Sequence, residues 1–474
     1  MKFSITGKKR LAAGQIFSPE NLFVVIGYLF GLSLVFANPP FHSNDEDRHF
    51  YNSYFLSTGQ IRPVQHENQI GGYLPYNLHE VCETFQGIPF NKGARISPAK
   101  LKEMKSVPLR DSVKVFYDNP SYRTNPVPYM PFVIGIWIAR AVNSNPIHLL
   151  WGARIAGLIV YLLIVFYAIK IIPVHKYVLL AVALTPMTLF QAASVGYDVL
   201  SMSLSFLIIA LALKYAFQEK KIQTRQVVLF LCIVLLHCFA KPGYFLVPFL
   251  FFIIPGKNIG SAKKTAAVFA CLVIICFLPS ITWGSYLSSL HLQGGKALLN
   301  DFVYGSHEQV KVILKEPAVF AVNFLLNFIA QGKEWIIGSL GRLGYSYTHL
   351  NHTVLFIHGL VLIALSILDA SASASRTIII SSGQKLLISG IAFGTIGILT
   401  AGFFFSSPVG AHTIFGLQGR YFIPILPLLL LLNSNRASRT VAWDADVWKP
   451  LIVPIYATAL LGYTVVFITK HFYY

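Results

Sequence analysis

Apolar segments alternate with polar connectors along almost the whole chain, and two of the polar stretches are much longer than the others. Several apolar segments reach the roughly 20 residues that a helix needs to cross the hydrocarbon core of a bilayer. The pattern therefore predicts an all-α, polytopic membrane protein with about eleven transmembrane helices. The predicted spans are residues 22–37, 155–172, 177–193, 199–216, 227–239, 244–254, 266–283, 354–368, 386–405, 422–432 and 451–468.

The two long polar stretches are predicted to be large loops. The first, residues 39–147, contains an apolar segment at 132–142 that is too short to span, so we expect it to lie in the membrane interface as a helix. The second, residues 284–352, contains an apolar segment at 318–329 that is either re-entrant or interfacial. The predicted divisions are an N-terminal tail (1–20), a transmembrane domain (21–440) and a last connector with the C-terminal span (441–474).

Basic residues predict which side of the membrane each connector occupies. Lys and Arg cluster before the first span and again after the spans at 199–216 and 244–254. Because cytoplasmic loops carry the excess of Lys and Arg, these ends face the cytoplasm and both large loops face away from it. An alternative for the first apolar segment is a signal peptide cleaved after Ala37. The later spans, and Pro39-Pro40 closing the segment, favour a membrane helix.

Composition supports the membrane class and narrows the partners. Hydrophobic residues make up 55% of the chain, charged residues only 12%, and the mean hydropathy is +0.60. The net charge of +19 is spread over short clusters between apolar segments, a placement that sets topology and neutralises lipid head groups. We therefore expect a lipid bilayer, and no nucleic acid, as partner. The five cysteines show neither a disulfide framework nor a CxxC metal site.

Unusual polar residues gather on the predicted outer side. Fourteen of the 19 acidic residues fall there, most densely in the sequence Asn-Asp-Glu-Asp-Arg-His-Phe at residues 44–50. Asp198 begins a span on the same side, and three cations stand at outer helix ends against the positive-inside trend: Arg154, Lys241 and Arg420. Separately, these residues fit a solvated charge run, a helix cap and snorkelling side chains. Together they indicate a functional cluster at the outer surface.

The residue types in this cluster suit transfer of a group carried on a lipid phosphate. A carboxylate at the membrane surface can take a proton from an acceptor hydroxyl. Cations at helix ends can hold the phosphate of a lipid-linked donor and stabilise its departure as an anion. The chain has no Walker-type glycine loop, no HExxH and no GxSxG, so these nucleotide-dependent, zinc-peptidase and serine-hydrolase chemistries lack support.

Several short motifs, in this order and at these topological positions, resemble the DUF2142 family of bacterial membrane proteins. The motifs are Pro39-Pro40, Asp45-Glu46-x-x-His49-Phe50, Tyr54 and Gly59, Pro128-Tyr129-Met130-Pro131, Gly196-Tyr197-Asp198, Lys241-Pro242-x-Tyr244 and Gln418-Gly419-Arg420-Tyr421. One departure is Asn44, where the family pattern has Pro. The resemblance spans about residues 20–432, and the family in turn looks like a branch of the GT-C glycosyltransferases.

This resemblance implies a GT-C-like fold, a polyprenyl-phosphate sugar donor and an extracytoplasmic glycan, lipid or protein acceptor. It assigns catalysis to Asp45, with Glu46 beside it, and donor-phosphate binding to Lys241, Arg420 and the weaker candidate Arg154. Residues that shape the site or orient the acceptor would be His49, Tyr129, Tyr197, Asp198 and Tyr421. It implies no definite cofactor. A divalent cation bound by Glu46, His49 and Asp198 is an alternative, although their spacing is not diagnostic of a metal.

Two other function classes stay open at this point. One is a transporter or flippase of lipid-linked sugars, and the other is a non-catalytic subunit of an envelope polysaccharide assembly complex. The middles of the apolar segments carry almost no charge, which disfavours an ion pathway. The expected location is the bacterial inner membrane, with the active site on the extracytoplasmic side.

Overall fold

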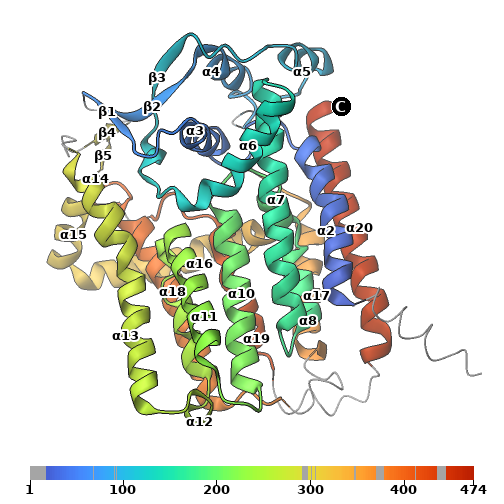
Figure 1. The fold of residues 1–474 in the computed structure, drawn as a ribbon, viewed down its shortest axis with the longest axis vertical. Helices are drawn as coiled ribbons and strands as arrows, with labels where there is room; N and C mark the ends of the chain where they lie inside the picture. The colour runs from blue at the N-terminus through green and yellow to red at the C-terminus, as the bar shows by residue number, and fades with distance from the viewer. Residues whose placement is uncertain are drawn as a thin grey trace, which may run out of the picture.

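The computed structural model describes residues 18–67, 69–89, 91, 93–290, 297–299, 302–304, 306–345, 348–369, 378–411, 413–434 and 445–474. Residues 1–17 of the predicted tail and 441–444 of the last connector lie outside this set. Most described residues are helical, and the long helices run roughly side by side along the long axis of the molecule (Figure 1). A layer of short helices and strands covers one end of this bundle, and we call it the cap.

Among the described residues, six helical segments are long and apolar enough to cross a membrane, which confirms a polytopic membrane protein. They are α2 (Pro19–Ala37), α7 (Pro146–Ile171), α10 (Asp198–Phe217), α18 (Ser382–Phe405), most of α20 (Ala445–Tyr473), and the segment Ala262–Ser289, which comprises α13 (Ala262–Pro279), η5 (Ser280–Gly284) and α14 (Ser285–Ser289). A seventh candidate is a pair bent by 106°, formed by α15 (Ser306–Lys315) and α16 (Pro317–Gly341). This pair contains the apolar segment 318–329.

The other five predicted spans fall in short or broken helices. These are α8 (Lys176–Ala183) with α9 (Pro186–Ala192), α11 (Thr224–Ala240), η3 (Pro242–Tyr244) with η4 (Val247–Ile253), α17 (His352–Leu368), and η8 (Gly419–Ile425) with α19 (Leu426–Leu431). Proline accounts for several breaks, because it lacks the N–H that a continuous helix needs. Pro186 begins α9 and Pro424 lies within η8. By helix length and composition, the described residues contain six candidate spans, or seven with the bent pair, so the total of about eleven stays a prediction.

The first large loop forms most of the cap, and here the all-α prediction is wrong. Its helices are α3 (Glu46–Ser57), α4 (Tyr76–Glu83), α5 (Pro98–Met104), η1 (Pro120–Arg123), η2 (Val127–Tyr129) and α6 (Met130–Val142). Its strands, β1 (Val64–His66), β2 (Gln69–Pro75) and β3 (Lys114–Asp118), form an antiparallel sheet. A short hairpin of β4 (Ala297–Leu299) and β5 (Phe302–Tyr304) lies in the second large loop.

Two glycines of β2 let this strand lie close to β3 and to α3. A Cβ on Gly71 would lie 1.7 Å from the carbonyl oxygen of Tyr117 across the strand pair. A Cβ on Gly72 would lie 2.8 Å from the ring of Phe55 on α3. Strand β2 therefore approaches β3 and the C-terminal part of α3 as closely as only glycine allows.

Helix α6 coincides with the predicted interfacial helix and has 13 residues, too few to span. It packs against α7 at a close crossing, where a Cβ on Gly135 would lie 2.3 Å from the carbonyl oxygen of Gly152. Its other face leaves Ile134, Trp137 and Ile138 exposed. This apolar exposed face is what a helix lying in the membrane interface needs.

The cap end of the bundle collects the ends of elements far apart in sequence (Figure 1). Helix α2 rises to it and leads into α3, α10 starts from it, and α11 ends at it. Helix α10 is the most deeply buried of the six candidate spans, and it contacts α7, α9, α11, η4 and η8. Asp198, at its first turn, is therefore surrounded by other helix ends beneath the cap.

Candidate functional site

The Asp45-Glu46 pair is divided between two different environments. Glu46 and Arg154 of α7 form a fully buried ion pair, with Arg154 Nε and Nη2 donating to the carboxylate at 2.8 and 2.5 Å. The remaining N–H groups of Arg154 donate to three backbone carbonyls at the end of α2 and just after it. Glu46 also accepts the backbone N–H of Val195 at 3.0 Å. All five donors of the guanidinium are used, so Arg154 has none to offer a phosphate.

Asp45 is the accessible member of the pair. It is the N-cap of α3 in the left-handed conformation, with φ 57° and ψ 21°, and its side chain is 40% exposed. Tyr345 fixes it from the second large loop, because the backbone N–H of Asp45 donates to the Tyr345 hydroxyl at 3.1 Å and that hydroxyl faces the carboxylate at 3.4 Å. Such a backbone conformation is uncommon outside glycine and concentrates at functional sites.

Asp198, Lys241 and Arg420 form a buried charge cluster beside Asp45. Lys241 Nζ lies 2.8 Å from Asp198 Oδ1, and Arg420 Nη1 lies 3.6 Å from Asp198 Oδ2. Arg420 Nη2 lies 3.7 Å from Asp45 Oδ2, which joins the exposed carboxylate to the buried group. Three helix ends separated by long stretches of sequence supply these residues: the starts of α10 and η8, and the turn after α11.

Arg420 is buried but loosely held. Its side chain is 3% exposed, yet its nearest partners are the Tyr421 hydroxyl at 3.2 Å and Gln191 Oε1 at 3.4 Å, with both carboxylates farther away. Within the described part of the chain, its Nε has no hydrogen-bond partner, and neither has Gln191 Nε2. A buried guanidinium normally makes shorter, well-aligned bonds. Arg420 therefore has donor capacity that a bound anion could use.

Lys241 lies in an aromatic enclosure. Its ammonium is 3.9 Å from the ring centre of Tyr421, 4.5 Å from that of Tyr197 and 5.5 Å from that of Tyr244. Burial lowers the pKa of Lys241 to about 8, and the neighbouring Asp198 carboxylate opposes this shift. Cation–π contact stabilises the charged form while leaving N–H groups free for another acceptor.

His49 and Tyr129 form a hydrogen-bonded pair next to the charges. His49 Nδ1 is 2.8 Å from the Tyr129 hydroxyl, and its ring packs edge-on against Tyr197. Asn52, one turn nearer the end of α3, donates to the same hydroxyl at 3.0 Å. Burial lowers the pKa of His49 to about 4, so its imidazole is neutral near pH 7. This pair can orient a polar ligand without adding charge.

The structure brings together most of the residues singled out from the sequence. The cluster contains Asp45, His49, Tyr129, Tyr197, Asp198, Lys241, Arg420 and Tyr421. Glu46 and Arg154 belong to the separate buried pair. Sequence reasoning missed Tyr345 and Gln191, for which no local signal exists. It also passed over Tyr244 as a site residue, although Tyr244 stands in the Lys-Pro-x-Tyr motif.

A divalent cation finds no ready set of ligands in this arrangement. Among the described residues, no group of three His, Cys, Asp or Glu side chains is placed to hold a metal ion. Glu46 is committed to Arg154, and Asp198 is neutralised by Lys241. The chemistry proposed below therefore relies on protein side chains alone.

A cleft of about 370 Å³ adjoins the cluster. Its walls are the segment around Thr124, the end of α11 with Lys241 just after it, and the end of α13 with Trp283 of η5. Tyr197 and Lys241 line both the cleft and the cluster. An anionic group bound near Lys241 could thus extend into this cleft.

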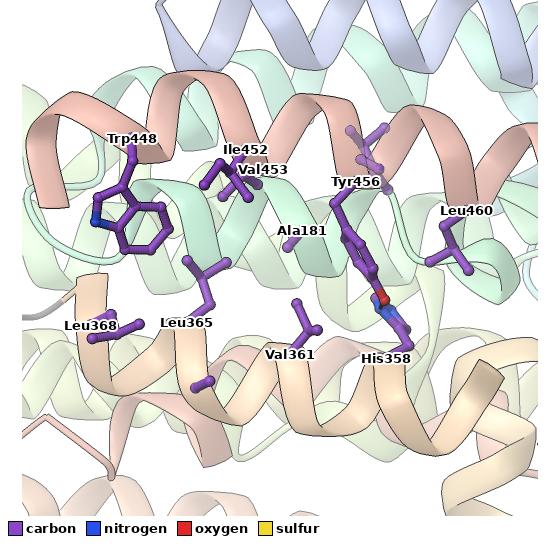
Figure 2. A pocket seen from close by; sticks show the side chains of 13 residues that line it. Ala181, His358, Val361, Leu365, Leu368, Trp448, Ile452, Val453, Tyr456 and Leu460 are labelled. Atoms are coloured by element: carbon purple, nitrogen blue, oxygen red, sulfur yellow. Dashed lines mark hydrogen bonds between the residues drawn. The ribbon is translucent and has the colours of Figure 1, made fainter. Parts of the chain in front are cut away.

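A second cavity, of about 210 Å³, lies between α17 and α20 with Ala181 of α8 at its wall (Figure 2). Its lining is apolar except for His358, Tyr456 and Trp448. Both ring nitrogens of His358 are hydrogen-bonded, to Thr185 and to the Tyr456 hydroxyl. Among the described residues, no carboxylate, lysine or arginine lines it. His358 is thus held by two protein partners, and this mainly apolar cavity is not the candidate reaction site.

The helical bundle, its capping loops and the buried charge cluster define a polytopic membrane protein. Its sequence matches the family described as "Predicted membrane protein (DUF2142)" over residues 28–429. The chain therefore belongs to the DUF2142 family. No curated protein and no solved structure matches the chain.

Proposed function

We propose that this protein is a membrane glycosyltransferase that moves a sugar from a polyprenyl-phosphate donor to an extracytoplasmic glycan, lipid or protein. The GT-C-like class remains part of this proposal. The observation that carries it is the contact between Arg420, a buried and loosely paired cation, and Asp45, the exposed carboxylate. Such a site has an accessible base beside a cation whose N–H groups are not all hydrogen-bonded, and this arrangement suits displacement of a lipid phosphate.

The reaction we propose is a single displacement. Asp45 takes the proton of the acceptor hydroxyl, and the acceptor oxygen attacks the anomeric carbon of the donor sugar. The bond between that carbon and the phosphate oxygen breaks, and its electron pair leaves with the polyprenyl phosphate. Arg420 and Lys241 stabilise the charge that develops on the phosphate. Asp198 holds both cations, while His49, Tyr129 and Tyr197 shape the acceptor side.

The charge pattern of the bundle supports an extracytoplasmic site in the bacterial inner membrane. The turn after α10 carries Lys220 and Lys221, and α13 begins with Lys263 and Lys264, all at the end opposite the cap (Figure 1). By the positive-inside rule, that end faces the cytoplasm. The cap, with Asp45, then faces outward, where lipid-linked sugars are donors because nucleotide sugars are absent.

The test of this function compares envelope glycans of a deletion strain, its parent and a strain restored with the gene. Mass spectrometry should show that one sugar substituent is lost on deletion and recovered on restoration, while the lipid-linked donor is still exported. A complete lipid-linked precursor retained inside the cell would identify a flippase instead. An unaltered glycan profile under conditions where the parent expresses the protein would contradict both functions.

Donor binding should depend on pH through Lys241. The lowered pKa of about 8 means that Lys241 is cationic below that pH and loses its charge as the pH rises through it. The KM for the lipid donor should therefore rise above about pH 8. Lys241→Arg keeps its charge at every such pH, because a guanidinium stays protonated throughout this range. This variant should lose the alkaline rise in KM, and an identical rise in both proteins would remove Lys241 from donor binding.

A further inference from the structure

The cleft beside Lys241 has a polar wall and an apolar wall. Arg123, Thr124 and Asn125 of the cap form the polar side. The opposite side is mostly apolar: it comprises Phe239, Ala240 and Pro242 around Lys241, and Pro279, Trp283 and Gly284 around Ser280. A molecule with a charged head and a hydrocarbon chain would match both walls.

The two helices that flank the cleft lie at the outside of the bundle (Figure 1). Leu236, near the end of α11, is exposed, as are Phe277 and Ile281 near the end of α13. In a bilayer such side chains contact lipid chains. The cleft is therefore lined by the cap-side ends of two segments that carry exposed apolar side chains, as lipid-facing helices do.

The outer end of α13 is built irregularly at this place. Pro279 ends the regular helix, and residues 280–284 form a wide π turn. The indole N–H of Trp283 donates to the backbone carbonyl of Arg123 at 2.7 Å and so ties the helix to the cap. Gly284 faces open space, because a Cβ there would meet no atom within 4 Å. Short π segments in helices are frequent at functional sites.

We propose that this cleft binds the first part of the hydrocarbon chain of a polyprenyl phosphate, which reaches it from the bilayer between α11 and α13. The phosphate lies between Lys241 at the inner wall and Arg123 at the mouth. Arg123 is exposed, and none of the ion pairs among the described residues involves it. This inference rests on the proposed donor class and adds a chain-binding groove and a third cation to it.

The test uses the purified full-length protein in lipid nanodiscs and a polyprenyl monophosphate with a photoreactive diazirine on an isoprene unit next to the phosphate. After irradiation, mass spectrometry should locate the label in residues 239–242 and 279–284. Gly284→Leu fills the cleft and should reduce labelling about tenfold, which corresponds to about 1.4 kcal/mol of binding free energy. Gly390→Leu on α18 is the matched control, because Gly390 also faces open space. Its labelling should equal that of the parent protein.

A second variant tests Arg123. Arg123→Gln should weaken labelling by the polyprenyl phosphate and leave labelling by the uncharged polyprenol unchanged, because only the phosphate needs the cation. Equal labelling of the Gly284→Leu and parent proteins, or labels confined to the cavity between α17 and α20, would overturn the proposal.

This experiment and the glycan test fail independently. Labelling does not require sugar transfer, so a positive result beside an unchanged glycan profile would leave a lipid-phosphate site in a protein that is not a transferase. Loss of a sugar on deletion, with labels elsewhere in the protein, would refute the groove and leave the transferase standing.

Discussion

Asp45→Asn is expected to fold normally and to lower turnover about 10²- to 10⁴-fold, the usual contribution of a general base. Asparagine has nearly the same shape and can still accept a hydrogen bond from Tyr345, but it cannot take the proton of the acceptor hydroxyl. The measurement is the rate of sugar transfer from a radiolabelled lipid donor by the purified variant at saturating donor. Donor binding should change much less than turnover, because the base acts on the acceptor.

Asp47→Asn is the matched control for this loss. Asp47 is two residues away on the same helix, and no ion pair joins it to the charge cluster. The same chemical change there should alter turnover little. Near-normal turnover in a folded Asp45→Asn protein would rule out Asp45 as the base.

Glu46→Gln is expected to destabilise the fold by about 3–5 kcal/mol, because it leaves the guanidinium of Arg154 buried and without its counter-charge. Both side chains are fully buried, and the pair joins α3 and α7 to the end of α2. The measurement is thermal or denaturant unfolding in detergent, together with the yield of folded protein.

Glu103→Gln provides the control, since Glu103 pairs with Lys100 on the exposed surface of α5. An exposed pair contributes at most about 1 kcal/mol, so its loss should hardly change unfolding. The surviving folded Glu46→Gln protein should keep much of its turnover per molecule. Normal stability with abolished turnover would instead indicate that Glu46 takes part in catalysis.

The candidate site was partly predictable because each connector of a membrane protein lies on one of only two sides of the membrane. Once the spans and basic clusters are assigned, Asp45, Asp198, Lys241 and Arg420 fall on one side and near the ends of helices. Helix ends at the same surface of a bundle share one layer of the structure, where their side chains are able to approach one another. Contacts as specific as Arg420 to Asp45 could not be derived this way, because they depend on which helices are neighbours.

The different roles of the adjacent residues Asp45 and Glu46 show most clearly what the sequence alone could not predict. Asp45 and Glu46 are adjacent acids with the same chemistry, and sequence reasoning treated them as one catalytic pair. Successive residues at the start of a helix point in different directions, so one carboxylate faces the accessible side while the other meets Arg154 of α7. Arg154 was predicted to bind the phosphate because the sequence indicates its position on the outer side of the membrane. The sequence does not show that Glu46 and backbone carbonyls accept all of its hydrogen bonds.

By itself, the sequence determined the membrane class, the large loops, the placement of basic residues and the family motifs. These properties follow from local composition, since the hydrophobic effect and helix geometry act on each segment separately. Only the tertiary structure decided the number of long helices, the sheet in the cap and the division between Asp45 and Glu46. Those depend on how the helices pack against one another and on ion pairs between residues more than a hundred positions apart, which no local pattern encodes.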